Sequence, residues 1–122
     1  MFTFNKTHFA GNLTRDPEVR YSPEGTACAT LGVAINHRYK KGEDMKEEVT
    51  FIDVIAWGKL GENCGQYLKK GAGVLVSGRL RQRRWETDAG DKRSKIEVVA
   101  ETVGFLPRRE AADGADGGDI PF

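Results

Sequence analysis

Arginine recurs at every second position from residue 79 to residue 83, and tryptophan follows at residue 85. Side chains of a β-strand alternate between its two faces, so one face would carry Arg79, Arg81, Arg83 and Trp85. The other face would carry Val74, Val76, Gly78 and Leu80 and point into the protein. The arginine face has no acid of its own before Glu86. Guanidinium groups neutralise phosphates and an indole stacks on unpaired bases, so this row is a candidate nucleic-acid surface.

Two further segments place aromatic rings near cations. In segment 49–57, one face would carry Phe51, Asp53, Ile55 and Trp57. Its other face, suited to the interior of a small barrel, would carry Thr50, Ile52, Val54 and Ala56. Tyr39 stands among Arg38, Lys40 and Lys41. Rings stack on any base because every base has a flat face, which indicates sequence-tolerant binding. The expected phosphate contacts are Arg38, Lys40, Lys41, Lys59, Arg79, Arg81, Arg83 and Arg84.

The elements that must position these side chains are mostly strands. Five strands are expected over residues 4–13, 26–36, 49–57, 74–85 and 94–106, with connections over 14–25, 37–48 and 86–93. Residues 59–70 carry apolar side chains at helical spacing, with Gly71 as a possible cap. Gly61 and Gly65 weaken this helix, so packing must hold it. This order predicts an all-β, five-stranded OB-fold barrel with one short helix between strands 3 and 4.

Charge divides the chain into two expected regions. All 19 Lys and Arg lie within residues 1–110, whereas the last twelve residues carry three Asp and no base. Residues 110–118 are mostly Ala, Gly and Asp, which predicts a flexible acidic tail over 110–122 after a domain over 1–109. The tail ends in Asp119, Ile120, Pro121 and Phe122. Apolar side chains beside a terminal carboxylate indicate a tip that binds a basic, apolar pocket on a partner protein.

The sequence predicts no catalytic site and no metal or cofactor site. The sequence has no metal-ligand spacing, no nucleophile with a plausible base and no phosphate-binding Gly-Lys-Ser loop, so we expect neither an enzyme nor a metal or cofactor. Cys28 and Cys64 are expected to be small apolar residues of the interior. The chain has neither a membrane-spanning apolar run nor a signal-peptide pattern at its start, so a cytoplasmic location is expected. A nucleic-acid binder there would be associated with the nucleoid.

Several short motifs together resemble one family. They are Gly11-Asn12-Leu13, the segment 16–21, Trp57-Gly58-Lys59-Leu60, the segment 67–71, Gly78-Arg79-Leu80-Arg81, Arg84-Trp85 and the terminal Asp-Ile-Pro-Phe. The chain resembles the bacterial and phage single-stranded DNA-binding proteins from about residue 5 to residue 105 and again in the tail. The resemblance implies an OB-fold, usually a homotetramer, that wraps single-stranded DNA. By position, the base-stacking rings would be Tyr39, Phe51, Trp57 and Trp85.

The same resemblance implies roles in replication, recombination and repair, with partner proteins recruited through the tip. Two departures concern the tail: the spacer before the tip is only about ten residues, and its Asp residues are spread out by Gly and Ala.

Two alternative functions remain open on the same fold. One is a protein-interaction adaptor such as a primosome component, against which the Asp-Ile-Pro-Phe ending argues. The other is a metal-dependent nuclease, for which Asp53 is the one acid expected on the binding face.

Overall fold

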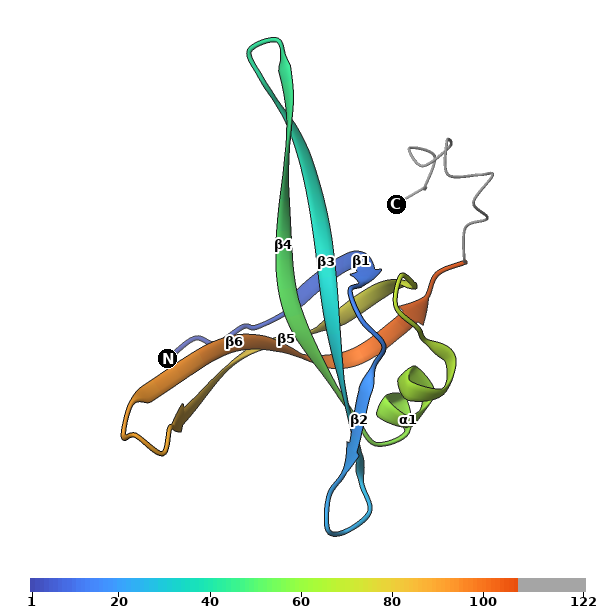
Figure 1. The fold of residues 1–122 in the computed structure, drawn as a ribbon, viewed down its shortest axis with the longest axis vertical. Helices are drawn as coiled ribbons and strands as arrows, with labels where there is room; N and C mark the ends of the chain where they lie inside the picture. Colours follow the sequence, from blue (N-terminus) through green and yellow to red (C-terminus); the bar gives the residue numbers. More distant parts are fainter. Residues whose placement is uncertain (108–122) are drawn as a thin grey trace.

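The computed structural model describes residues 1–107, which form six strands and one helix (Figure 1). The elements are β1 (Thr7–Leu13), β2 (Glu18–Tyr21), β3 (Ala27–Lys41), β4 (Asp44–Trp57), α1 (Gly58–Tyr67), β5 (Gly73–Glu86) and β6 (Lys92–Phe105). The expected acidic tail over 110–122 and the domain boundary at residue 109 lie outside the described residues and stay predictions.

Five long strands close into a barrel, as the sequence predicted. The strand order is β1-β5-β6-β4-β3-β2, and β1 also pairs with β3 at Asn12↔Ala34 and Leu13↔Val33. This second pairing joins β1, at one end of the sheet, to β3 near the other end and closes the barrel. α1 follows β4 and precedes β5, which is the predicted place between the third and fourth barrel strands. The OB-fold is therefore confirmed.

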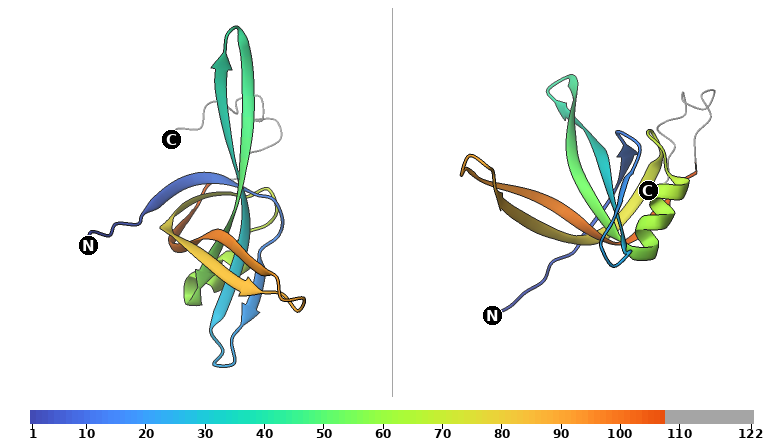
Figure 2. Two further views of the ribbon diagram at one scale, coloured as in Figure 1. Left: turned by 90° about the vertical axis from the view of Figure 1, so that its left-hand side faces the viewer. Right: turned by 60° about the horizontal axis from the view of Figure 1, so that its bottom comes forward.

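Two hairpins extend from the barrel in different directions (Figure 2). One is formed by β3 and β4, which stay paired from Cys28↔Trp57 to Lys41↔Asp44. The other is formed by the distal halves of β5 and β6, which stay paired out to Glu86↔Lys92. Both hairpins continue strands that begin in the barrel, so their positions are set by the core.

The core contains the apolar side chains of one face of each barrel strand. Leu31, Val33, Val54 and Val76 are completely buried, and Val98 is nearly so. Burial of apolar surface stabilises the fold by about 25 cal/mol per Å² removed from water. In β4 Val54 and Ala56 are buried and Ile52 is half-buried, as expected, but Thr50 lies in the projecting hairpin and is exposed. Ile55, expected on the outer face, is buried as well, with 8% of its surface exposed.

A β-bulge between Ser77 and Gly78 separates the barrel half of β5 from its hairpin half. A Cβ atom at Gly78 would lie 2.2 Å from the carbonyl oxygen of Val99, so the two strands approach closely there. The prediction that Leu80 points into the core is wrong, because its side chain is 47% exposed. Beyond the bulge β5 leaves the barrel together with β6, and within residues 1–107 no opposite sheet covers the inner face of this part of β5.

Helix α1 is held by the close approach that its glycines allow. A Cβ atom at Gly61 would lie 2.4 Å from the carbonyl oxygen of Ala56, and one at Gly65 would lie 2.4 Å from the side chain of Val19. The helix ends at Tyr67, three residues before the predicted end, because Leu68 has extended backbone angles. Gly71 does not cap the helix, but adopts a φ of 92° in the turn that follows.

Three strand predictions need correction. β1 begins at Thr7, whereas Phe4 precedes it and is 90% exposed. The expected connection 14–25 contains β2, which pairs with β3. The expected connection 37–48 is the distal part of the β3–β4 hairpin. Lys and Glu have low strand propensity and bury nothing there, so neither pattern nor propensity predicts this extension.

In residues 1–107 no helix is long and apolar enough to cross a membrane.

Candidate nucleic-acid interface

The outer face of β4 presents the two predicted rings. Phe51 is 71% exposed and Trp57 is 47% exposed, and both belong to the face of β4 opposite to the core residues. On the neighbouring strand, Trp57 lies opposite Cys28 and Phe51 lies opposite Ala34. Small neighbours leave the ring faces open to a flat ligand, which is what base stacking requires.

The arginine row of β5 continues this outer face. Arg79 and Arg83 are exposed, Arg81 is partly exposed, and Trp85 is 41% exposed at the end of the row. The guanidinium carbon of Arg83 lies 4.7 Å from the centroid of the Trp85 ring, which is within cation–π distance. The predicted combination of cations and a ring on one strand face is therefore present.

The arginine row has no acid of its own on β5, but it is paired with an acid from the neighbouring strand. Glu97 of β6 lies opposite Arg81, is 2% exposed, and accepts hydrogen bonds from Arg81 Nη2 at 2.6 Å and Arg83 Nε at 3.1 Å. Strand alternation within β5 could not show the pairing because the acid comes from the next strand. Two of the three arginines thus share one buried carboxylate.

Asp53, the acid predicted on the β4 face, lies between two cations. It accepts hydrogen bonds from Lys95 and from Arg15, whose Nη2 lies 3.4 Å from Asp53 Oδ1. Arg15 reaches it across Gly32 of β3, which lies directly opposite Asp53 and has no side chain. Burial alone would raise the pKa of Asp53, but the hydrogen bond and charge of Lys95 and those of Arg15 outweigh it and hold this pKa below its ordinary value.

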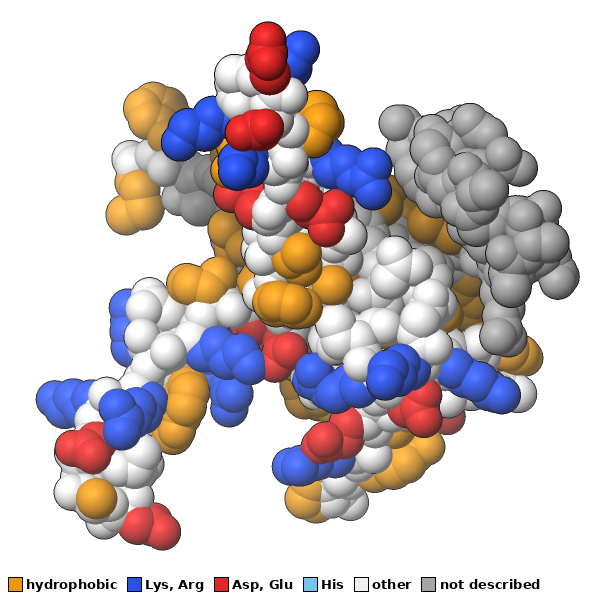
Figure 3. All heavy atoms as spheres, turned by 45° about the horizontal axis from the view of Figure 1, so that its top comes forward, with side chains coloured by type: hydrophobic (Ala, Val, Ile, Leu, Met, Phe, Trp, Pro, Cys, Tyr) orange, Lys and Arg blue, Asp and Glu red, His pale blue; other side chains and the backbone are white. Residues whose placement is uncertain are grey.

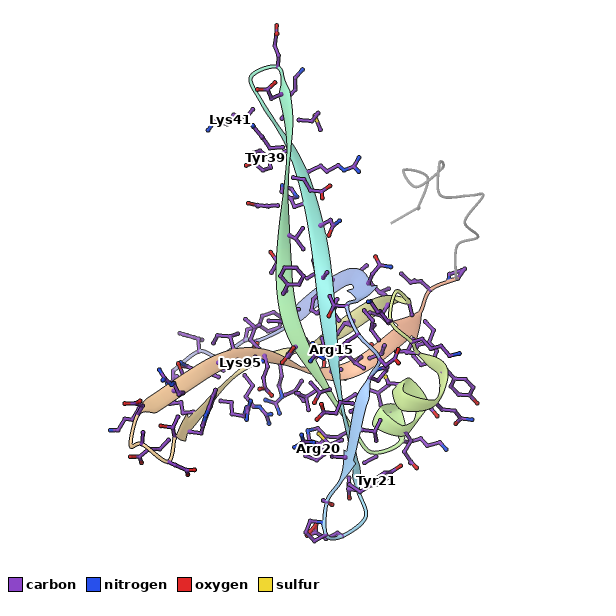
Figure 4. All side chains as sticks on the ribbon, in the orientation of Figure 1. Arg15, Arg20, Tyr21, Tyr39, Lys41 and Lys95 are labelled. Atoms are coloured by element: carbon purple, nitrogen blue, oxygen red, sulfur yellow. The ribbon has the colours of Figure 1, made fainter. Side chains whose placement is uncertain are left out.

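Three cations on this face were not among the predicted contacts: Arg15, Arg20 and Lys95. Figure 4 shows Arg15 and Lys95 near the crossing of β4 and β6, and Arg20 on β2. Arg20 lies opposite Cys28 in the ladder and makes a 2.7 Å ion pair with Glu18. The alternation of charges at residues 18 and 20 was a signal for a strand that the sequence analysis assigned to a connection.

A shallow groove of about 340 Å³ crosses the outer face between β2 and β5. Its lining includes Arg20, Trp57, Arg81 and Arg83. In the space-filling view, Lys and Arg side chains form a band across the molecule with acids among them, and hydrophobic side chains stand on the projecting β3–β4 hairpin (Figure 3). The groove therefore combines a ring with cations from two separate strands.

The predicted ligand-binding residues of the β3–β4 hairpin do not all lie on one face of it. Tyr39 stacks on His37, with ring centroids 6.1 Å apart, and both continue the alternation of Ile35, whereas Phe51 belongs to the opposite set. Arg38 pairs with Glu47 at 3.1 Å. Tyr39 and Lys41 lie near the hairpin tip, away from the barrel (Figure 4). Lys40 and Lys41 are exposed there, so this cluster can contact only a ligand that reaches beyond the groove.

Two predicted phosphate contacts lie away from the groove. Arg84 alternates with Arg83 and Trp85 on β5, and its Nη2 donates to Gln82 Oε1 at 2.9 Å on the other face of the strand. Lys59 is exposed in the first turn of α1. The tip residues Asp119, Ile120, Pro121 and Phe122 lie outside the described residues.

The described residues give no sign of a metal centre. Residues 1–107 contain no group of three or more His, Cys, Asp or Glu that could hold a metal ion. The three carboxylates that line the groove, Glu18, Asp53 and Glu97, are each paired with a cation. Cys64 is buried, which raises its pKa to about 11, and Cys28 is half-buried, which also raises its pKa. Both thiols therefore stay protonated near neutral pH.

A small barrel with rings and cations gathered on one outer face defines a nucleic-acid-binding domain of the OB class. The profile described as "Single-strand binding protein family" matches residues 4–106. The chain belongs to this family. Membership in a family of binding proteins agrees with the expectation that the chain is not an enzyme.

Individual relatives are similar over most of the chain. A single-stranded DNA-binding protein of Wolinella succinogenes is 44% identical over 95% of this chain and 72% of its own length. One of Treponema pallidum is 47% identical over 87% of this chain and 60% of its own length. A crystal structure of a deletion mutant of the single-stranded DNA binding protein from Thermus aquaticus superposes with a TM-score of 0.77 at 34% identity, covering 87% of this chain and 52% of that one.

Proposed function

We propose that this protein binds single-stranded DNA without sequence preference and protects it by wrapping the strand around the barrel. The observation that carries the proposal is the outer face itself, where Phe51 and Trp57 lie exposed beside the arginine row that ends in Trp85. Unpaired bases can stack on these rings while the cations neutralise phosphates. A duplex hides the faces of its bases, so it cannot use the rings.

The direct test compares a dT strand with a duplex of the same length at the same salt concentration. Fluorescence anisotropy should show much tighter binding of the strand and equal binding of strands of mixed sequence. Comparable affinity for the duplex would contradict the proposal.

Assembly as a homotetramer forms part of the proposal. β1 pairs with β5 from Thr7 to Asn12 but with β3 only at Asn12 and Leu13. In the part of the chain that the structure describes, the stretch 7–11 therefore has a free edge on its other side. A free edge can pair with the same strand of a second copy. Wrapping also favours several copies, because one barrel carries few rings. Native mass spectrometry with and without oligo-dT should give a tetramer, and a monomer that retains tight DNA binding would refute this.

The tail over 110–122 is proposed to recruit proteins of replication, recombination and repair in the cytoplasm, at the nucleoid. Ile120 and Phe122 are apolar, Pro121 stiffens the chain between them, and the terminal carboxylate suits an Arg or Lys at the rim of a pocket. Deleting residues 119–122 should abolish recovery of partners in pull-downs and leave DNA binding intact or slightly tighter. Appending one Gly after Phe122 displaces the carboxylate and serves as the matched variant. Unchanged recovery with both would reject this role.

A further inference from the structure

Glu97 is the one buried charged side chain among residues 1–107, and both of its oxygens are occupied. Oε2 accepts from Arg81 Nη2 at 2.6 Å, and Oε1 accepts from Arg83 Nε at 3.1 Å. Removing the partners of a buried carboxylate is strongly destabilising, so the two guanidinium groups stay with Glu97 when another anion approaches. Each can then offer an incoming phosphate only its remaining N–H groups.

The pair between Glu97 and Arg83 also determines how Trp85 is presented. With Nε held by the carboxylate, the guanidinium of Arg83 lies 4.7 Å from the centroid of the Trp85 ring. A planar cation over the ring covers one face of the indole, and Trp85 keeps 41% of its surface exposed. A base can therefore stack on the remaining face.

From these contacts we infer that Glu97 is a positioning residue for nucleic-acid binding, which fixes Arg83 over Trp85 and neutralises one of the two guanidinium charges. The inference rests on the proposed function and deepens it. Arg81 and Arg83 together then neutralise about one phosphate of the bound strand. Arg79 differs because it lies opposite Val99, which carries no charge, and makes no ion pair among residues 1–107. Its charge acts on Glu101, but that carboxylate is already hydrogen-bonded by Lys6.

Two substitutions separate the charge of Glu97 from its geometry. Glu97→Gln removes the charge, whereas Glu97→Asp keeps it but shortens the side chain by one methylene, so one carboxylate can no longer reach both arginines. Glu62→Gln, in the exposed part of α1, is the matched control for net charge. All variants are made with Trp57→Phe, which leaves Trp85 as the sole indole of the chain. Circular dichroism and thermal melting verify folding.

The first measurement is the salt dependence of dT binding. Freeing one guanidinium should make the log–log slope more negative by about 0.7 in Glu97→Gln. Glu97→Asp and Glu62→Gln should keep the slope of the parent. An unchanged slope in folded Glu97→Gln would overturn the charge assignment.

The second measurement needs no DNA, so it distinguishes failure of this inference from failure of the proposed function. Glu97→Gln and Glu97→Asp should both shift the emission maximum of Trp85 in the free protein, because Arg83 is released from the ring. In an Arg83→Ala background the same substitutions should cause no shift. An unshifted emission in Glu97→Asp, or a shift that persists without Arg83, would overturn the inference even if dT binding is tight. If Glu97→Gln does not fold, Glu97→Asp alone decides it.

Discussion

Lys95 of β6 donates a hydrogen bond to Asp53 of β4, and this contact joins the two hairpins where they leave the barrel. Arg15, from the connection between β1 and β2, binds the other oxygen of the same carboxylate. Asp53 therefore ties three segments together on the face proposed to bind DNA.

Asp53→Asn should lower the free energy of unfolding by roughly 1 kcal/mol near neutral pH. Because the folded-state pKa of Asp53 lies below its unfolded value, the stabilisation is present above the unfolded pKa and is lost as the pH falls through the folded pKa. Urea unfolding of parent and variant from pH 7 down to pH 3 measures this. The difference between them should shrink toward the acid end, and a constant difference would contradict the assignment.

Phe51→Ala and Trp57→Ala should each weaken binding of dT by roughly 1–3 kcal/mol, because each removes one stacking platform. Tyr67→Ala is the control, since Tyr67 is 63% exposed but lies on α1 beside Phe105. Fluorescence anisotropy titrations of dT with each variant, at one salt concentration, measure these affinities. Equal losses in all three variants would show that exposed rings contribute without regard to their position.

Arg79→Ala should flatten the salt dependence of dT binding by about 0.7 in log–log slope, the loss of one phosphate contact. Arg84→Ala should leave the slope unchanged, because Arg84 lies on the other face of β5 with Gln82. Both variants remove one positive charge, but from opposite faces of β5, so the comparison tests whether the position of the charge matters. A flatter slope in both would mean that the strand contacts both faces of the hairpin.

Gly61→Ala should destabilise the fold by roughly 1–3 kcal/mol, since the added Cβ would lie 2.4 Å from the carbonyl oxygen of Ala56 and the barrel backbone has little room to move. Gly104→Ala is the control, because its Cβ would meet Leu75 at an ordinary 3.6 Å. Thermal melting compares the two variants. Similar melting temperatures would show that α1 shifts away from β4 without cost.

The confirmed predictions of the fold concern strands and a helix that bury one face. The alternation of side chains between the two faces of β4 and of the barrel half of β5 identified the core residues Val54, Ala56, Val74 and Val76 and the exposed rings Phe51 and Trp57, although Ile55 on the face of the rings is buried. The helix was predicted from the spacing of its apolar residues, and its place between the strands predicted the OB-fold. These features are encoded locally, because a strand or helix that buries one face needs a matching period in its sequence.

Tertiary structure alone decided which charges meet. Glu97 and Arg81 are 16 residues apart, and Asp53 and Lys95 are 42 residues apart, so their pairing depends on strand register. The distal β3–β4 hairpin likewise has no buried face to impose a period, and its ladder continues from register set in the core. Sequence thus determined that one outer face carries rings and cations. The fold determined which of those cations are already neutralised, because electrostatic partners are chosen by proximity in space and leave no periodic signal along the chain.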